Sequence, residues 1–285
     1  MNNRFVLITG TSRGIGRATA LRLASAGMAV IAGVRNPEDG ARLESEAKGR
    51  LTGTLLDISR DESIENAAEV IREMVGDRGL FGLVNNAAGM GRGSPMEYVT
   101  REDLQAAFQV TAFGTVLTTR ALLPLVKAAG GRIVNVGAGR LPLPLHGAGF
   151  GAKFALEAMT DVLRVELRRA RVHVSIVEPG MTLWEDPDQQ LASYDQALEE
   201  GLRSVPPEGR ARYEVAIQRF KALNRRMLKR AAPAEAVAAA IQRALLASRP
   251  KARCHCGWEQ KVVALLERFA SARMRDAIVG SMLGL

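Results

Sequence analysis

The sequence has few of the residues on which several classes of protein depend. Its 285 residues include two cysteines, Cys254 and Cys256, which cannot build a disulfide framework and which suit a reducing cytoplasm. No apolar run approaches the roughly 18 residues of a membrane helix. The first residues lead directly into a predicted strand, so we expect no signal peptide and no transmembrane segment in this cytoplasmic protein.

Ligand sets and acidic residues are also scarce. Cys254 and Cys256 share one face of a predicted strand, but no second pair of ligands accompanies them, so we expect no metal site. The formal net charge is +9. Such a balance can favour nucleic acid, an anionic membrane or an acidic partner. Because no nucleic-acid-binding motif is present, we expect no nucleic-acid partner and interpret most of the charge as solvated surface.

Short apolar runs alternate with amphipathic segments as far as residue 177. This βαβ order predicts a parallel sheet with helices on both faces, the doubly wound α/β fold, or Rossmann fold. The predicted strands are Phe5–Ile8, Ala29–Val34, Leu51–Leu56, Leu80–Val84, Arg132–Val136 and Val172–Val177. The predicted helices are Ile15–Ala26, Pro37–Lys48, Glu62–Val75, Arg101–Ala129 and Gly149–Arg169.

The alternation ends after Gly180. Residues 181–210 show no clear period, whereas residues 211–230 predict a basic amphipathic helix. The last predicted elements are a helix at Ala234–Ala247, a strand at Lys251–Cys256 and a helix at Glu259–Met282. Because no repeat or linker divides the chain, we expect one domain over residues 1–285, with residues 181–230 inserted as a helical lid over a substrate pocket.

A glycine-rich turn, LITGTSRGIG, joins the first predicted strand to the first predicted helix. Its glycines allow a tight turn and the close approach of a pyrophosphate, which the helix N-terminus attracts. Because strand, turn and helix follow in this order, the motif predicts a dinucleotide site and not only a structural turn. The residues predicted to bind the cofactor here are Gly10, Ser12, Arg13, Gly14, Ile15 and Gly16.

The sequence has no carboxylate where one would hold the ribose 2′-hydroxyl of NAD. Gly33, Val34 and Arg35 occupy those positions. Arg13 and Arg35 instead favour a 2′-phosphate, because a guanidinium matches phosphate in bidentate fashion. We therefore predict NADP(H) as the cofactor; the alternative is that both arginines are solvated surface residues.

Further motifs resemble the short-chain dehydrogenase/reductase family, in particular its retinol- and steroid-dehydrogenase-like branch. TGTSRGIG resembles that family's TGxxxGIG, LVNNAAG its NNAG motif, AKFALEAMTDVLRVEL its lysine helix, and VSIVEPGMT its sixth strand with a Pro-Gly turn. The resemblance covers nearly the whole chain and implies a dimer formed by the helices near 101–129 and 149–169. It also implies cofactor contacts at Asp57, Ile58, Asn86, Ala87, Lys153, Pro179, Gly180 and Thr182.

The resemblance fails at the catalytic tetrad of Asn, Ser, Tyr and Lys. Thr111 stands at the asparagine position, Gly137 or Ala138 at the serine position and Gly149 at the tyrosine position, so that only Lys153 remains. No tyrosine occurs between positions 98 and 194, and no serine between 94 and 175, so no reasonable gap restores either. Loss of a positioned proton donor typically costs about 10²–10⁴ in rate.

Other residues could take over the missing chemistry. The candidate catalytic residues are Lys153, Thr111 and His146, whose imidazole could replace the acid or could be an ordinary loop histidine. Tyr194 and Tyr213 could turn a hydroxyl inward, or could simply pack the lid. A tyrosine at 149 with a serine at 138 should restore some carbonyl reduction, unless the glycine at 149 makes room for a close backbone.

Four functions therefore remain open, of which a nucleic-acid or membrane binder has only the net charge in its support. The chain could be an atypical enzyme that acts on a small hydrophobic or carrier-bound substrate by altered chemistry, non-redox reactions included. It could be a catalytically silent subunit, in a homodimer or in a pseudo-heterodimer with an active homologue. It could also be an NADPH-dependent carbonyl oxidoreductase with a different proton donor. We favour the first, because the lid and pocket segments persist, and we note that the basic helix 211–230 suits an acidic carrier protein.

Overall fold

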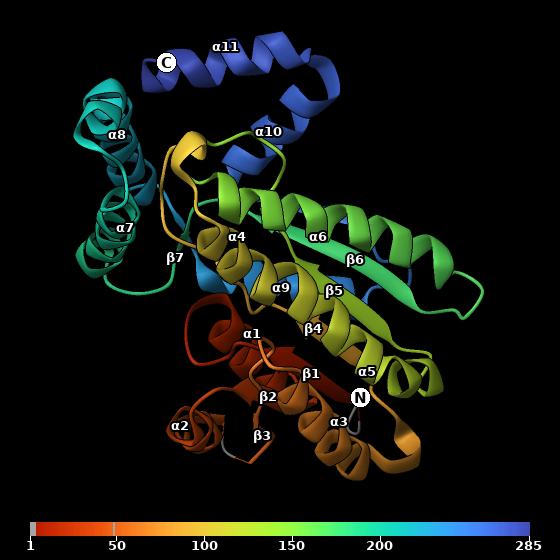
Figure 1. The fold of residues 1–285 in the computed structure, drawn as a ribbon. Helices are drawn as coiled ribbons and strands as arrows, with labels where there is room; N and C mark the ends of the chain where they lie inside the picture. The colour runs from red at the N-terminus through yellow and green to blue at the C-terminus, as the bar shows by residue number, and fades with distance from the viewer. Residues whose placement is uncertain (1–3, 48) are drawn as a thin grey trace.

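A seven-stranded parallel sheet forms the centre of the molecule (Figure 1). The computed structural model describes residues 4–47 and 49–285. The strand order is β3-β2-β1-β4-β5-β6-β9. The strands are β1 (Phe5–Thr9), β2 (Ala29–Val34), β3 (Leu51–Leu55), β4 (Gly82–Asn85), β5 (Arg132–Val136), β6 (His173–Pro179) and β9 (Arg253–Cys256).

Helices cover both faces of the sheet, which explains why its central strands are apolar on both sides (Figure 1). One core lies under α1 (Gly14–Ser25), α2 (Pro37–Ala47) and α9 (Ala234–Leu246). The other lies under α3 (Asp61–Val75), α5 (Thr115–Ala128) and α6 (Gly147–Glu166). The predicted doubly wound α/β fold is confirmed, and the order of strands reverses between β1 and β4, where such folds bind ligands.

The predicted helix Arg101–Ala129 was wrong as a single regular helix. It consists of α4 (Arg101–Phe108), a π-helical segment (Gln109–Gly114) and α5. The wider turn brings Gly114 against the backbone of Ile58, where any side chain on Gly114 would overlap the Ile58 carbonyl oxygen. This contact depends on a distant loop, so helical periodicity could not reveal it.

The segment after Gly180 is more regular than its sequence pattern suggested. Residues 181–210, which show no clear period in the sequence, contain β7 (Thr182–Leu183) and α7 (Pro187–Leu202). Asp186 caps α7 by accepting hydrogen bonds from two backbone N–H groups. The predicted basic helix is α8 (Pro207–Leu228), and β8 (Ala232–Pro233) pairs with β7. The predicted apolar side of α8 is buried, and it packs with α7.

The predicted C-terminal helix Glu259–Met282 was also wrong as one helix. It divides into α10 (Trp258–Phe269) and α11 (Ala272–Leu283), and Ser271 caps the second. The other predicted boundaries lie within about three residues of those observed, except that Lys48, the predicted end of α2, lies outside the described residues.

Candidate cofactor site and active site

The glycine-rich turn sits at the carboxyl end of β1, where each glycine has a steric reason. Gly10 and Gly14 have φ of +69° and +62°, a region that favours glycine. A Cβ on Gly10 would lie 2.9 Å from the Cα of Ala87. A Cβ on Gly16 would overlap the carbonyl oxygen of Gly10 and lie 2.5 Å from Nδ2 of Asn86. The turn therefore packs directly on the loop that follows β4.

Hydrogen bonds fix these two loops to each other. The Asn86 amide donates to the carbonyl oxygens of Thr9 and Gly10, at 3.0 and 2.9 Å. The backbone N–H groups of Asn86 and Ala87 both donate to the Thr9 hydroxyl, at 3.0 Å. The predicted residues Gly10, Gly16, Asn86 and Ala87 thus pack together at the switch point of the sheet.

The N-terminus of α1 is suited to an anion. Its N-cap residue, Arg13, has extended backbone and makes no side-chain cap, and no acidic residue occupies the first turn, which contains Ile15. Free N–H groups and the helix dipole therefore face the turn. The Arg13 guanidinium lies 4.6 Å from the centre of the Trp184 ring, and both residues line a cavity of about 450 Å³. Ser12, next to Arg13, accepts a 3.4 Å hydrogen bond from Arg42.

The second region that the sequence predicts to bind the cofactor lies after β2 and β3. Arg35 directly follows β2, and Asp57 and the buried Ile58 follow β3. Burial opposes ionisation of Asp57, but hydrogen bonds from the Ser59 N–H and hydroxyl and the charge of Arg35 outweigh it, so the Asp57 pKa is lowered. Asp57 is therefore an ionised acceptor on the same edge of the sheet as Arg35.

The loop after β6 is held by a buried glutamine. β6 ends at Pro179, and Gly180 donates to the Cys256 carbonyl at 2.7 Å. Gln190 of α7 donates to the Thr182 carbonyl at 2.8 Å and accepts from the Trp184 N–H at 3.1 Å. Sequence reasoning missed Gln190, because nothing in the polar segment around it indicated a fully buried side chain.

At the asparagine position, Thr111 is fully buried within the π-helical segment. Its hydroxyl donates to the carbonyl oxygen of Gly89 at 2.9 Å and receives the Gly89 N–H at 3.0 Å. The hydroxyl therefore fastens the loop after β4 and has its hydrogen-bonding capacity committed there.

At the tyrosine position, Gly149 is buried near the start of α6. A Cβ on Gly149 would overlap the carbonyl oxygen of Met90 and lie 3.0 Å from its carbonyl carbon. The backbone of the loop after β4 thus occupies the space that any side chain at 149 would need. Of the two explanations that the sequence left open for this glycine, the geometry supports the close backbone.

The loop that holds the predicted serine position, Gly137 or Ala138, is contacted by a side chain from the C-terminal region. Gln260 of α10 donates to the Ala138 carbonyl at 2.9 Å. A Cβ on Gly139 would overlap the side-chain oxygen of Gln260. A Cβ on Gly137 would lie 2.8 Å from Ile176. Gln260 is 8% exposed. Sequence reasoning missed it, because it lies 122 residues away along the chain.

Lys153, which the sequence predicts at the lysine position of the tetrad, lies on α6. Its ammonium group is buried and donates to the carbonyl oxygen of Val136 at 2.6 Å. Burial lowers the Lys153 pKa to about 8, and the negative charge of Glu157, one turn further along α6, opposes this effect. Through this hydrogen bond the Lys153 ammonium on α6 reaches the last residue of β5, and a pKa of about 8 lets it lose a proton near neutral pH.

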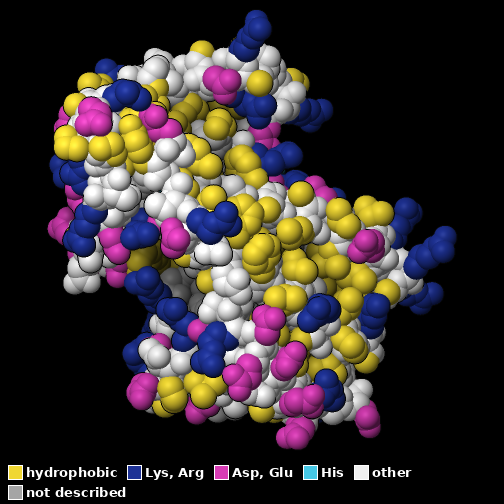
Figure 2. Space-filling view, in the orientation of Figure 1, with side chains coloured by type: hydrophobic (Ala, Val, Ile, Leu, Met, Phe, Trp, Pro, Cys, Tyr) yellow, Lys and Arg dark blue, Asp and Glu magenta, His cyan; other side chains and the backbone are white. Residues whose placement is uncertain are grey.

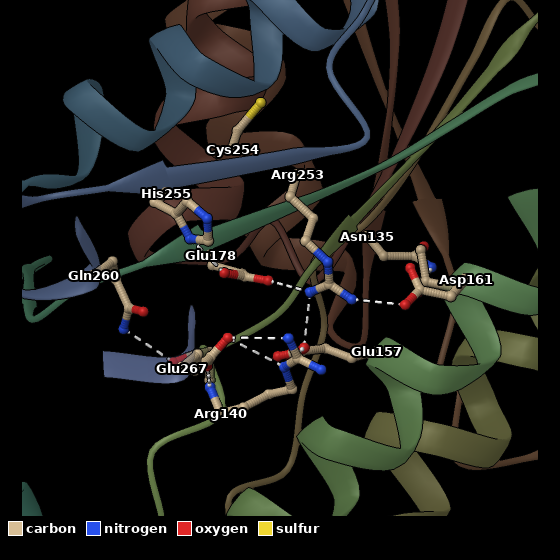
Figure 3. A network of polar contacts seen from close by, with 12 residues as sticks. Asn135, Arg140, Glu157, Asp161, Glu178, Arg253, Cys254, His255, Gln260 and Glu267 are labelled. Carbon is tan, nitrogen blue, oxygen red and sulfur yellow. Dashed lines mark hydrogen bonds and ion pairs between the residues drawn. The ribbon is translucent and has the colours of Figure 1, made fainter. Parts of the chain in front are cut away.

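A charged network around Arg253 includes Glu157 of α6 (Figure 3). Arg253 of β9 donates to Glu157 at 2.8 Å, to Asp161 at 2.8 Å and to Glu178 at 2.5 Å. Burial and the neighbouring charge of Glu178 raise the Glu157 pKa to about 6. His255 contacts Glu178 at 2.6 Å. The network ties β9 to α6.

The other candidate proton donors are engaged elsewhere. His146 is the N-cap residue of α6 and stacks on Phe220 of α8 with 4.9 Å between ring centres. Burial lowers its pKa to about 4, so it is neutral at pH 7. The Tyr194 hydroxyl accepts from Gln190, and the Tyr213 hydroxyl donates to Glu97, both at 2.8 Å.

The cysteine pair is less reactive than free thiols. Burial raises the pKa of Cys254, and raises that of Cys256 to about 11. Within residues 4–47 and 49–285, no cluster of three or more His, Cys, Asp or Glu side chains could hold a metal ion. Over the same residues, no helix combines the length and the apolar character needed to cross a membrane.

Comparisons with known proteins agree with this geometry. A family model described as short chain dehydrogenase matches residues 4–192. Mouse retinol dehydrogenase 5 is 35% identical over 282 residues, which cover 98% of this chain and 88% of that protein. Mouse 17-beta-hydroxysteroid dehydrogenase type 6 is 31% identical, with the same coverage of each. A short-chain dehydrogenase structure from Streptomyces avermitilis superposes with a TM-score of 0.76 at 25% identity, covering 98% of this chain and 96% of that one.

Proposed function

The chain belongs to the short-chain dehydrogenase family, whose members bind NAD(P)(H), and from that premise we propose that it binds NADP(H) and acts on a small hydrophobic or carrier-bound substrate without a tyrosine proton donor. The contact between Gly149 and the Met90 backbone carries the proposal, because it leaves no room for a donor at the tyrosine position. Cyclisation, elimination and hydride transfer to an acceptor that needs no protein acid all meet this description.

The choice of NADP(H) rests on charge and geometry. Arg13 stands at the uncapped N-terminus of α1, and Arg35 follows β2. Gly10, Gly14 and Gly16 would admit the pyrophosphate, Asp57 would meet the adenine, and Thr182 and Lys153 would hold the nicotinamide half. When bound, NADPH would supply a hydride. Lys153, with its pKa near 8, is the group of this chain that would hold or release a proton.

The reading as an ordinary carbonyl reductase with another proton donor has less support. His146 is neutral and stacked on the lid helix α8. The hydroxyls of Tyr194 and Tyr213 are hydrogen-bonded within and beside residues 181–230. None of the three presents a proton to the end of β5.

A catalytically silent subunit is the second candidate. Figure 2 shows a broad apolar area where Figure 1 places α4, α5 and α6. Phe113, Val116, Val162 and Val165 are exposed there. Such a face suits a homodimer or a pseudo-heterodimer with an active homologue. The acidic carrier protein suggested by the basic residues of α8, and the cytoplasmic location, stay predictions.

Calorimetric titration with NADPH and NADH tests the cofactor. NADPH should bind about tenfold more tightly or better, because charge-assisted hydrogen bonds to a 2′-phosphate contribute roughly 1.5–3 kcal/mol. Arg35→Asp should abolish the preference. Arg72→Asp, which makes the same charge change on α3, should keep it. Equal affinities in the unaltered protein would refute the assignment.

A turnover assay tests the chemistry. NADPH oxidation with aldehydes, ketones, retinal and steroids should show no tetrad-type carbonyl reduction. Rapid reduction of any of them would overturn the proposed loss of the donor, whatever the titration shows. If the protein forms a complex with a homologue, and the homologue is the active partner in that complex, the result would favour the function as a catalytically silent subunit.

A further inference from the structure

The two C-terminal helices carry rows of large apolar side chains that face solvent. On α10 the row is Trp258, Val262, Leu265 and Phe269, with Leu265 57% and Phe269 72% exposed. Because successive helical residues are 100° apart, these four positions fall within an arc of about 60°. The opposite side of α10 packs on the protein through Gln260 and Glu267.

A second row of exposed apolar side chains lies on α11. Met274, Ile278 and Met282 are exposed at four-residue spacing, while Val279 and Leu283 pack against α8. Apolar side chains in a regular row on a surface helix cost solubility and mark a surface that another apolar phase covers. Two successive helices, each with such a row, are typical of a segment that lies in a membrane interface.

The charges around the rows indicate what covers them. Lys261 and Arg268, seven residues apart, flank one side of the α10 row, and Arg273 is exposed on α11. Asp276 is the exposed acidic side chain of these two helices, since Glu259 is buried and Glu267 pairs with Arg140. Figure 2 shows hydrophobic and basic side chains together at the top of the molecule, where Figure 1 places α11.

We propose that α10 and α11 form a docking surface for an anionic lipid bilayer, with the apolar rows at the acyl boundary and the basic side chains at the headgroups. A second copy of the chain suits the surface less well, because a two-fold interface would bring the same cations together with few carboxylates to pair them. The docking needs no membrane-spanning helix, and it does not depend on the chemistry proposed for the active site.

Vesicle co-sedimentation tests the proposal. The protein should bind vesicles of phosphatidylcholine that contain phosphatidylglycerol. It should bind vesicles of pure phosphatidylcholine weakly, and high salt should weaken its binding to the anionic vesicles. Leu265→Glu with Phe269→Glu should weaken binding about tenfold or more. Lys261→Gln with Arg268→Gln should weaken it on the order of 25-fold, at about fivefold for each cation removed. Val70→Glu, an exposed change on α3, should bind like the unaltered protein.

Fluorescence provides an independent readout. The emission of Trp258 should shift to shorter wavelength with anionic vesicles and be quenched by brominated lipids, and Trp258→Phe should lose this response. Equal melting temperatures of the variants would show that folding is intact. Unchanged vesicle binding in Leu265→Glu with Phe269→Glu would overturn the proposal. The proposal would also be overturned if the unaltered protein bound no vesicles but formed an oligomer, or a complex with an acidic protein, and if Leu265→Glu with Phe269→Glu prevented that association.

Discussion

Replacing Gly149 by alanine should destabilise the fold, although alanine is the better helix former. The added Cβ would overlap the Met90 carbonyl oxygen, and that neighbour is main chain, which cannot turn aside as a flexible side chain can. Overpacking of this kind costs about 1–3 kcal/mol, against a gain of up to about 1 kcal/mol from helix propensity. Gly151→Ala is the matched control, because its Cβ would meet only Phe108, at 3.8 Å.

Urea unfolding of both variants measures the difference. Gly151→Ala should match or exceed the unaltered protein. Gly149→Ala, which gains the same helix propensity, should be less stable than Gly151→Ala by about 1–3 kcal/mol, with a melting temperature lower by several degrees. Gly149→Tyr with Ala138→Ser should be destabilised further and should show no carbonyl reduction. A stable Gly149→Ala, or an active double variant, would refute the reasoning, since either would mean that the loop after β4 moves aside freely.

Two further predictions concern buried charges. The imidazole of His146 has a pKa near 6.5 in the unfolded chain and about 4 in the folded protein. The free energy of unfolding should therefore fall as the pH drops from 6.5 to 4, by at most about 3 kcal/mol. His146→Phe should flatten this fall in urea titrations at several pH values. Arg253→Met should lower the free energy of unfolding by about 3–5 kcal/mol, because it leaves buried carboxylates without their cation. Arg164→Met breaks a more exposed pair and should lower it by less than about 1 kcal/mol in the same assay.

The α/β architecture and the glycine-rich turn could be predicted because both are local in sequence. Each strand is a short apolar run, and Gly10, Gly14 and Gly16 are needed within a few residues of one another. Helix α7 and the break between α10 and α11 could not be predicted in this way. The buried side of α7 is short and partly polar, with Gln190 inside it, and its neighbour α8 provides much of the apolar surface that covers it.

At the candidate active site, the sequence determined which groups are missing, since a proton donor that is not encoded near position 149 cannot be placed there by the helix. What replaces those groups was decided by tertiary contacts. Met90 occupies the space beside Gly149, and Gln260 reaches Ala138 from the far end of the chain. Arg253 joins carboxylates of α6 and β6. Each partner comes from a different element of the fold, and only the packing of those elements around the sheet fixes the distances between them.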